Sequence, residues 1–280
     1  MKRLLLVICM LSMGSMAWAQ SAPPLASASA FAVLSAAPPP TPGAVTCTNS
    51  AITGAVGSSG PAASVVRTVC PIAGAIIAPV SAQVLTDFNT AYDGLAPKPL
   101  DCDGAHTLLS TITGPVTLSP GVYCTPAALT GTGVLTLDGG GNSSAVWIFK
   151  IGSGTPATGA LTGTDFSVVL INGGQPCNVF WWVAQAVTMT NANFVGTILA
   201  GAAITSTGGP TGGTFAGRAM AKAAVTLTGT TLTDSCLGQN QGGGGNDDDH
   251  EGCKNDDGDH DKDKDHSDKG KDHRDDDHKD

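Results

Sequence analysis

Groups that could catalyse a reaction near neutral pH are scarce before Gly238. Apart from lysine and arginine, they are one histidine, His106, and the aspartates Asp87, Asp93, Asp101, Asp103, Asp138, Asp165 and Asp234. Glycoside hydrolysis needs two carboxylates held close together in a cleft, whereas these aspartates lie mostly beside turn or helix-end signals and are expected on the surface. No Gly-x-Ser-x-Gly elbow accompanies His106, and the glycine runs at 139–141 and 242–245 lack the Lys-Ser/Thr of a phosphate loop. The sequence therefore predicts a protein that is not an enzyme and needs no cofactor.

Threonine spacing points to a different chemistry. Three segments, at 187–190 (VTMT), 204–207 (ITST) and 225–228 (VTLT), carry threonine at alternate positions. A β-strand sends alternate side chains to opposite faces, so each segment would bury one set and expose two threonines. The candidate binding residues are therefore Thr188, Thr190, Thr205, Thr207, Thr226 and Thr228. Stacked in register, they would form a flat, uncharged grid of methyl and hydroxyl groups that suits an ordered, repetitive ligand, although threonine also favours exposed strands for conformational reasons alone.

A repeat indicates how these segments are positioned. Residues 194–205 (FVGTILAGAAIT) align with residues 215–226 (FAGRAMAKAAVT) at a shift of 21, and a looser copy occurs at 184–188. Repeats of about 20 residues typify stacked units that share one core, and strand-length units favour a β-solenoid. One stretch, 80–95, has helical periodicity instead, with Pro79 before it and Gly94 near its end.

Composition excludes two classes of partner. Residues 238–280 hold 16 acidic and seven basic side chains, whereas the rest of the chain holds seven of each. A body without net charge argues against nucleic-acid binding, which depends on neutralising phosphates. A membrane-spanning helix needs an uninterrupted apolar run of about 18 residues or more, and no run is that long. No membrane span is therefore expected in the mature chain.

Residues 1–19 look like a secretory signal peptide. Lys2 and Arg3 precede an apolar stretch at 4–11, and Ala17-Trp18-Ala19 is a small-residue cleavage site. An uncleaved membrane anchor is the alternative. We expect a secreted, extracellular or periplasmic protein.

An oxidising compartment makes the cysteines disulfide candidates. The six in the body are Cys47, Cys70, Cys102, Cys124, Cys177 and Cys236, for which 15 pairings are possible. Zinc is the rival interpretation, but no close CxxC pair is present and the body has a single histidine.

Many short motifs from residue 28 to residue 234 resemble the secreted ice-binding, or antifreeze-like, protein family, and they occur in the family's order. They are 28–34 (ASAFAVL), 52–57 (ITGAVG), 91–93 (AYD), 118–123 (LSPGVY), 129–131 (LTG), 135–138 (LTLD), 145–152 (AVWIFKIG), 170–174 (LINGG), 178–181 (NVFW), 196–200 (GTILA), 217–221 (GRAMA) and 224–227 (AVTL). The resemblance implies a mostly β fold: a right-handed discontinuous β-solenoid of triangular cross-section with one long helix packed alongside. It also implies binding to ice through one flat face. The assignment of the six candidate threonines to this face rests on strand alternation and not on a family motif. The cysteine-bearing segments 47–70 and 96–113 depart from the commoner pattern of the family.

The expected organisation has four parts. A signal peptide (1–19) and a flexible leader (20–30) precede an ice-binding-like β-solenoid domain (31–237), and a disordered tail (238–280) follows it. The tail mixes glycine, Asp, His and Lys with almost no apolar content, so it cannot form a packed core. It is either a solvating tail or a weak collector of divalent metal ions through its carboxylates and His250, His260, His266, His273 and His278.

Two functions remain open at this point. The first is adsorption to the surface of an ice crystal, which would hinder its growth or recrystallisation. The second is adhesion on the same scaffold to a polysaccharide, a mineral or a cell surface, with the acidic tail as an anchor. Trp147, Trp181 and Trp182 could stack on sugars, but their Val/Ile/Phe-rich surroundings favour the core.

Overall fold

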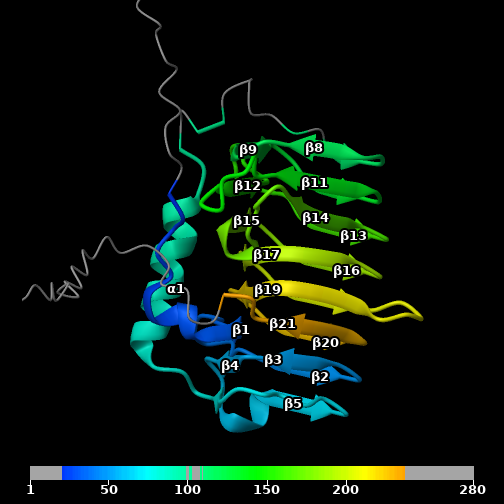
Figure 1. The fold of residues 1–280 in the computed structure, drawn as a ribbon. Coiled ribbons are helices and arrows are strands. Elements are labelled where there is room, and N and C mark those ends of the chain that lie inside the picture. Colours follow the sequence, from blue (N-terminus) through cyan, green and yellow to red (C-terminus); the bar gives the residue numbers. More distant parts are fainter. Residues whose placement is uncertain (1–20, 99–100, 103–107, 109, 237–280) are drawn as a thin grey trace, which may run out of the picture. The chain divides into compact units, whose positions relative to one another are not determined.

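Short parallel strands stacked in successive coils make up most of the described chain (Figure 1). The computed structural model describes residues 21–98, 101–102, 108 and 110–236, all within a compact unit that ends before residue 244. Each coil contributes one strand to an eight-stranded sheet and one or two to a thirteen-stranded sheet. The predicted mostly β fold with one helix is confirmed.

The eight-stranded sheet contains one strand from each of eight stacked coils. In stack order its strands are β5 (Val65–Thr68), β2 (Val45–Thr48), β20 (Val225–Thr228), β18 (Ile204–Thr207), β16 (Val187–Thr190), β13 (Leu161–Thr164), β10 (Leu129–Gly131) and β7 (Thr111–Ile112). Neighbouring strands pair in parallel without a register shift. Residues at equivalent places in successive coils therefore lie in straight columns.

The thirteen-stranded sheet has two limbs, which share the long strands β17 (Asn193–Ala200) and β19 (Gly213–Ala221). The first limb contains the first halves of β17 and β19. Its other strands are β3 (Ala51–Thr53), β21 (Thr230–Thr233), β14 (Ser167–Ile171), β11 (Val134–Asp138) and β8 (Val116–Leu118). The second limb contains the second halves of β17 and β19. Its other strands are β6 (Ile76–Ile77), β4 (Ala55–Ser58), β1 (Phe31–Ser35), β15 (Val179–Val183), β12 (Trp147–Ile151) and β9 (Gly121–Thr125). Where the limbs meet, Gly196 and Gly217 have φ values of 114° and 148°, which side chains rarely tolerate.

The stack does not follow chain order. β1 lies between β19 and β4, and β2 lies between β20 and β5. The first coils of the chain thus extend the stack beyond its last coil, and α1 then runs along the stack to the opposite end (Figure 1). This is the discontinuity that the family resemblance implied.

The predicted 21-residue repeat is confirmed by the pairing of β17 with β19. Phe194 lies opposite Phe215 and Gly196 opposite Gly217, while Thr205 lies opposite Thr226 in the other sheet. Between the sheets, rings from successive coils stack on one another: Phe149 and Trp181 have centroids 3.9 Å apart. The three tryptophans of the body are buried, as predicted.

The helix α1 (Ala82–Leu95) matches the predicted stretch at 80–95. The Ser81 hydroxyl accepts a hydrogen bond from the backbone NH of Val84 and caps its first turn. Its apolar stripe, which includes Phe88 and Tyr92, packs with Trp182 and other outward side chains of the second limb in a second core. Burial raises the pKa of Tyr92 to about 12, and its hydroxyl donates to the Val183 carbonyl at 3.2 Å.

All six candidate cysteines form disulfides: Cys47–Cys70, Cys102–Cys124 and Cys177–Cys236. Cys47 projects into the core from β2, so its bond to Cys70 ties together the two coils at one end of the stack.

The expectation that the aspartates lie on the surface is wrong for Asp234. Its side chain is fully buried and pairs with Arg218, whose side chain is 2% exposed, at 3.1 Å between Oδ2 and Nε. The Asp234 carboxylate also accepts a hydrogen bond from the backbone NH of Cys236, and Arg218 donates to the Cys236 carbonyl. Asp234 follows the last strand, which is a turn signal in sequence, but Cys236 is bonded to Cys177 and holds residues 234–236 against the domain.

Candidate functional site

The outward side of the eight-stranded sheet, the threonine face, consists of two columns of side chains. The first column is Thr111, Thr130, Thr162, Thr188, Thr205, Thr226, Thr46 and Val66. The second column is Thr164, Thr190, Thr207, Thr228, Thr48 and Thr68. The columns thus hold seven and six consecutive threonines, and only the last place of the first column is taken by another residue.

The six threonines selected from the sequence occupy neighbouring places in the middle of these columns. In β16, β18 and β20 the residues between them are buried, whereas the threonines are exposed or half-buried. The predicted placement on one face is therefore observed. Their contact with a ligand stays a prediction.

Seven members of the columns were missed from the sequence. They are Thr46, Thr48, Thr68, Thr111, Thr130, Thr162 and Thr164. The spacing of two residues was visible at 46–48 and 162–164, but the middle residues, Cys47 and Gly163, are not aliphatic and did not indicate a buried position.

Packing explains the glycines at these middle positions. A Cβ on Gly131 would come within 2.6 Å of the Phe166 ring, and one on Gly163 within 2.5 Å of the Met189 sulfur. The large neighbours fill the core beneath the face, so only glycine fits there. The outward threonines keep their register even where the inward pattern is lost.

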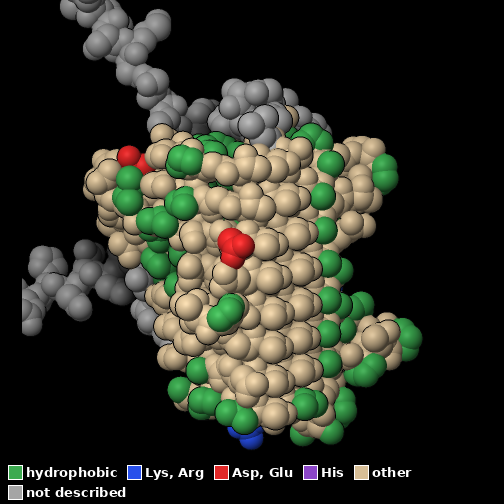
Figure 2. All heavy atoms as spheres, turned by 90° about the vertical axis from the view of Figure 1, so that its right-hand side faces the viewer, with side chains coloured by type: hydrophobic (Ala, Val, Ile, Leu, Met, Phe, Trp, Pro, Cys, Tyr) green, Lys and Arg blue, Asp and Glu red, His purple; other side chains and the backbone are tan. Residues whose placement is uncertain are grey.

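The geometry makes the face a regular lattice of small groups. Threonines lie about 4.7–4.9 Å apart between coils and about 6.5–7 Å apart along a strand. None of the thirteen threonine hydroxyls hydrogen-bonds to another group among the residues described, so each is free to bind water. No titratable side chain belongs to either column. Figure 2 shows the side of the molecule where β13, β16, β20 and β2 lie in Figure 1; small polar groups form regular layers there and charged side chains are rare.

Tight turns border the face on the side of the second column. Asp165, Asn191, Asn49 and Val69 each follow a second-column threonine and have φ values near 50°. Asn191 donates a side-chain hydrogen bond to the Asp165 carboxylate in the next coil. A residue at positive φ bends the chain sharply at the end of each of these strands.

Val69 is the unusual member of this series, because a β-branched residue is strained at positive φ. Asn49 takes the equivalent place in the adjacent coil, and asparagine tolerates this conformation. We expect Val69→Asn to raise the free energy of unfolding by about 1 kcal/mol, measured by urea denaturation. Val66→Asn, at an exposed strand position without positive φ, is the matched control. An equal rise in the free energy of unfolding for Val66→Asn would contradict the conformational explanation.

Some sequence predictions lie outside the described residues: the signal peptide, His106 and the five tail histidines. Among the residues described, no cluster of three or more His, Cys, Asp or Glu could hold a metal ion, and no helix is long and apolar enough to cross a membrane.

Comparison with known proteins decides the family. The model of the ice-binding-like family matches residues 41–233, a range that includes all eight strands of the threonine face. The chain belongs to the ice-binding-like family. Ice-binding protein 1 of Shewanella frigidimarina is 42% identical over 120 residues, and an ice-binding protein of Nostoc sp. is 38% identical over 131 residues.

These matches cover 42% and 46% of this chain, but only 13% and 45% of the two relatives. The superposition on a solved family member covers a larger share of both chains. The crystal structure of an ice-binding protein from the Antarctic ascomycete Antarctomyces psychrotrophicus superposes with a TM-score of 0.63 at 30% identity, covering 76% of this chain and 98% of that one. The ice-binding-like fold thus accounts for most of the described residues.

Proposed function

We propose that this chain is a secreted, non-enzymatic ice-binding protein that adsorbs to ice through the threonine face. The observation that carries the proposal is the pair of unbroken columns, seven and six threonines long, on one rigid sheet. Membership of the ice-binding-like family and the names of its relatives support it.

The physical basis is the addition of many weak contacts on a rigid platform. A methyl group is weakly hydrated, while a hydroxyl can hold one water molecule, so the columns would order water in a repeating pattern compatible with an ice lattice. Because the strands are held in parallel ladders, little conformational entropy is lost on binding. Adsorbed molecules would then hinder crystal growth and recrystallisation.

The direct test measures thermal hysteresis and ice recrystallisation inhibition for residues 20–237, without the tail. Activity at micromolar concentration is the expected result. A folded protein that shows neither activity at high micromolar concentration, and does not partition into growing ice, would contradict the proposal.

We predict that adsorption is independent of pH between 5 and 9, because neither column contains a titratable group. Hydrogen bonds from Ser27 lower the pKa of Asp87, and those from Gly140 and Asn172 lower that of Asp138, below the ordinary 3.8. Their stabilising effect is therefore fully present above about pH 4 and is lost only as the pH falls through the lowered values, so these two aspartates do not make stability depend on pH in this window. Recrystallisation inhibition assayed across the range tests this; a sigmoidal loss would implicate a charged group.

The triangular cross-section and the right-handed winding of the solenoid belong to the same proposal. Three strand segments per coil support a triangular cross-section, and parallel crossover connections are nearly always right-handed. We also propose a signal peptide that directs secretion and a tail from residue 238. The expectation of a flexible leader does not fit residues 25–30, because Leu25 and Ala28 are fully buried in the core beside α1.

A second candidate function is adhesion on the same scaffold to a polysaccharide, mineral or cell surface, with the acidic tail as an anchor. Its motivation is the uneven charge, −9 in residues 238–280 against zero elsewhere. The disulfide Cys177–Cys236 holds the last described residue beside η4 (Pro176–Asn178), between the two limbs of the larger sheet and away from the threonine face. Deleting residues 246–280 should abolish such adhesion, and any weak divalent-metal binding, while leaving ice adsorption intact; unchanged adhesion would refute this candidate.

A further inference from the structure

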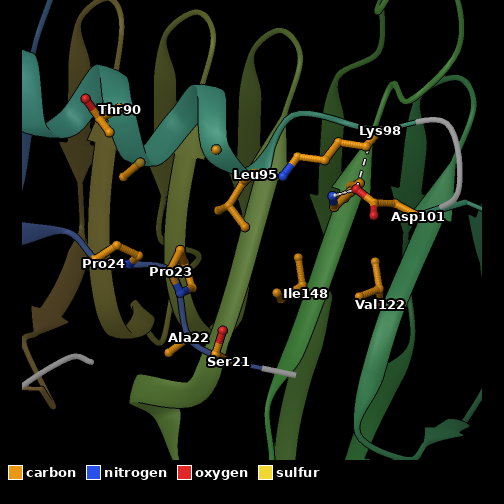
Figure 3. A pocket seen from close by; sticks show the side chains of 13 residues that line it. Ser21, Ala22, Pro23, Pro24, Thr90, Leu95, Lys98, Asp101, Val122 and Ile148 are labelled. Carbon is orange, nitrogen blue, oxygen red and sulfur yellow. Dashed lines mark hydrogen bonds and ion pairs between the residues drawn. The ribbon is translucent and has the colours of Figure 1, made fainter. Parts of the chain in front are cut away.

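A cavity of about 370 Å³ lies on the helix side of the molecule (Figure 3). Ala91 and Leu95 of α1 line one side of it, and Val122 and Ile148 of the second limb line another. Residues 21–24 of the leader, including two prolines, pass along its edge. Its volume falls within the usual range for small-molecule sites of about 300–1,000 Å³, and its lining is mainly apolar.

Three charged groups face this cavity: Lys98, Asp101 and Lys150. The Lys150 ammonium is 2.6 Å from Asp101 Oδ2, and the side chain of Lys150 is only 5% exposed. Burial alone would raise the pKa of Asp101, but the hydrogen bond and charge of Lys150 outweigh it and hold that pKa below its ordinary value. Asp101 therefore pairs with Lys150, and the backbone NH and the charge of Lys98 also lower its pKa.

Lys98 supplies the remaining charge. Its backbone NH donates to Asp101 at 3.1 Å, while its side chain extends toward Leu95 and Ile148 at the mouth of the cavity (Figure 3). No ion pair of its ammonium is found among the residues described. The described lining of the cavity thus combines mainly apolar walls with two lysines and one aspartate, a net charge of +1.

We propose that this cavity binds a medium-chain monocarboxylate, with the alkyl chain against Val122, Ile148 and Leu95 and the carboxylate beside the Lys98 ammonium. Charge complementarity selects the anion, since a neutral or cationic amphiphile of equal length would leave Lys98 without a partner. The site lies on the limb covered by α1, whereas the threonine face belongs to the other sheet. It is consequently independent of ice adsorption.

Isothermal titration calorimetry of the full chain with octanoate tests the proposal, with 1-octanol, octylammonium and butyrate as comparison ligands. Octanoate should bind with a sub-millimolar to low-millimolar dissociation constant and more tightly than the other three. Absence of octanoate binding at 10 mM, or equal binding of octylammonium, would overturn it.

Two variants localise the binding. Lys98→Gln should weaken octanoate binding about threefold to fivefold, the range expected for a partly exposed charge, and leave 1-octanol binding unchanged. Lys222→Gln, another lysine on the helix side, serves as its control because Lys222 pairs with Asp93 outside the cavity.

Gly94→Leu should block the cavity without harming the fold. Gly94 lines the cavity, a Cβ there meets nothing within 4 Å, and leucine is a better helix former than glycine. We expect loss of octanoate binding together with an unchanged or raised melting temperature and full ice adsorption. Unchanged octanoate affinity in this variant would place the binding elsewhere and refute the assignment.

Discussion

Replacing Thr205 by tyrosine is expected to reduce thermal hysteresis and recrystallisation inhibition by about tenfold, which corresponds to about 1.4 kcal/mol of adsorption energy. Thr205 lies in the middle of the first column, between Thr188 and Thr226. A phenol ring there would stand above the surrounding methyl and hydroxyl groups and hold several neighbouring threonines away from a flat crystal surface. The loss would therefore exceed the contribution of one threonine.

The matched control is Thr231→Tyr. Thr231 is an exposed threonine in a β-strand, whereas Thr205 is half-buried; it lies opposite Thr214 and belongs to β21 in the first limb of the other sheet. It should leave ice activity within twofold of the parent, and circular dichroism should show that both variants are folded. Equal loss in the two variants would indicate a general surface effect, and no loss for Thr205→Tyr would exclude the threonine face as the adsorption surface.

Replacing Asp234 by alanine is expected to lower the free energy of unfolding by about 3–5 kcal/mol. The buried Arg218 guanidinium would lose its carboxylate partner, and its Nη1 already has no hydrogen-bond partner among the residues described. The backbone NH of Cys236 would also lose its acceptor. Urea denaturation monitored by tryptophan fluorescence measures the change.

A double variant separates lost charge pairing from lost packing. Arg218→Met with Asp234→Asn removes both charges, retains an acceptor for the Cys236 NH and keeps much of the volume of the arginine stem. It should recover most of the stability, because an uncompensated buried charge is the main cost. Asp138→Ala, at the end of β11 where the carboxylate meets solvent, should cost far less than Asp234→Ala; a comparable loss there, or no recovery in the double variant, would contradict the explanation.

Local patterns were sufficient for several features of this protein. Alternation of threonine with apolar residues in 187–190, 204–207 and 225–228 predicted the strands and the side that faces outward, because the side-chain period of a strand is two. The 21-residue shift predicted that Phe194 would lie over Phe215, since stacked coils of equal length repeat their core contacts. Helical periodicity located α1 within two residues of its observed start.

Other features depended on contacts between distant segments. Thr46 and Thr48 extend the threonine columns only because β2, near the start of the described chain, packs beside β20, near its end. The burial of Asp234 beside Arg218, and the selection of three disulfides from 15 possible pairings, likewise follow from which segments the fold brings together.

Short-range periodicity in the sequence was enough to predict the coil and the outward direction of the central threonines, and the order of many short motifs indicated the family. Tertiary structure alone decided how far the columns run, which charge is buried and where a cavity remains beneath the helix. Those properties depend on which coils become neighbours, and the discontinuous stack places residues together that no local pattern connects.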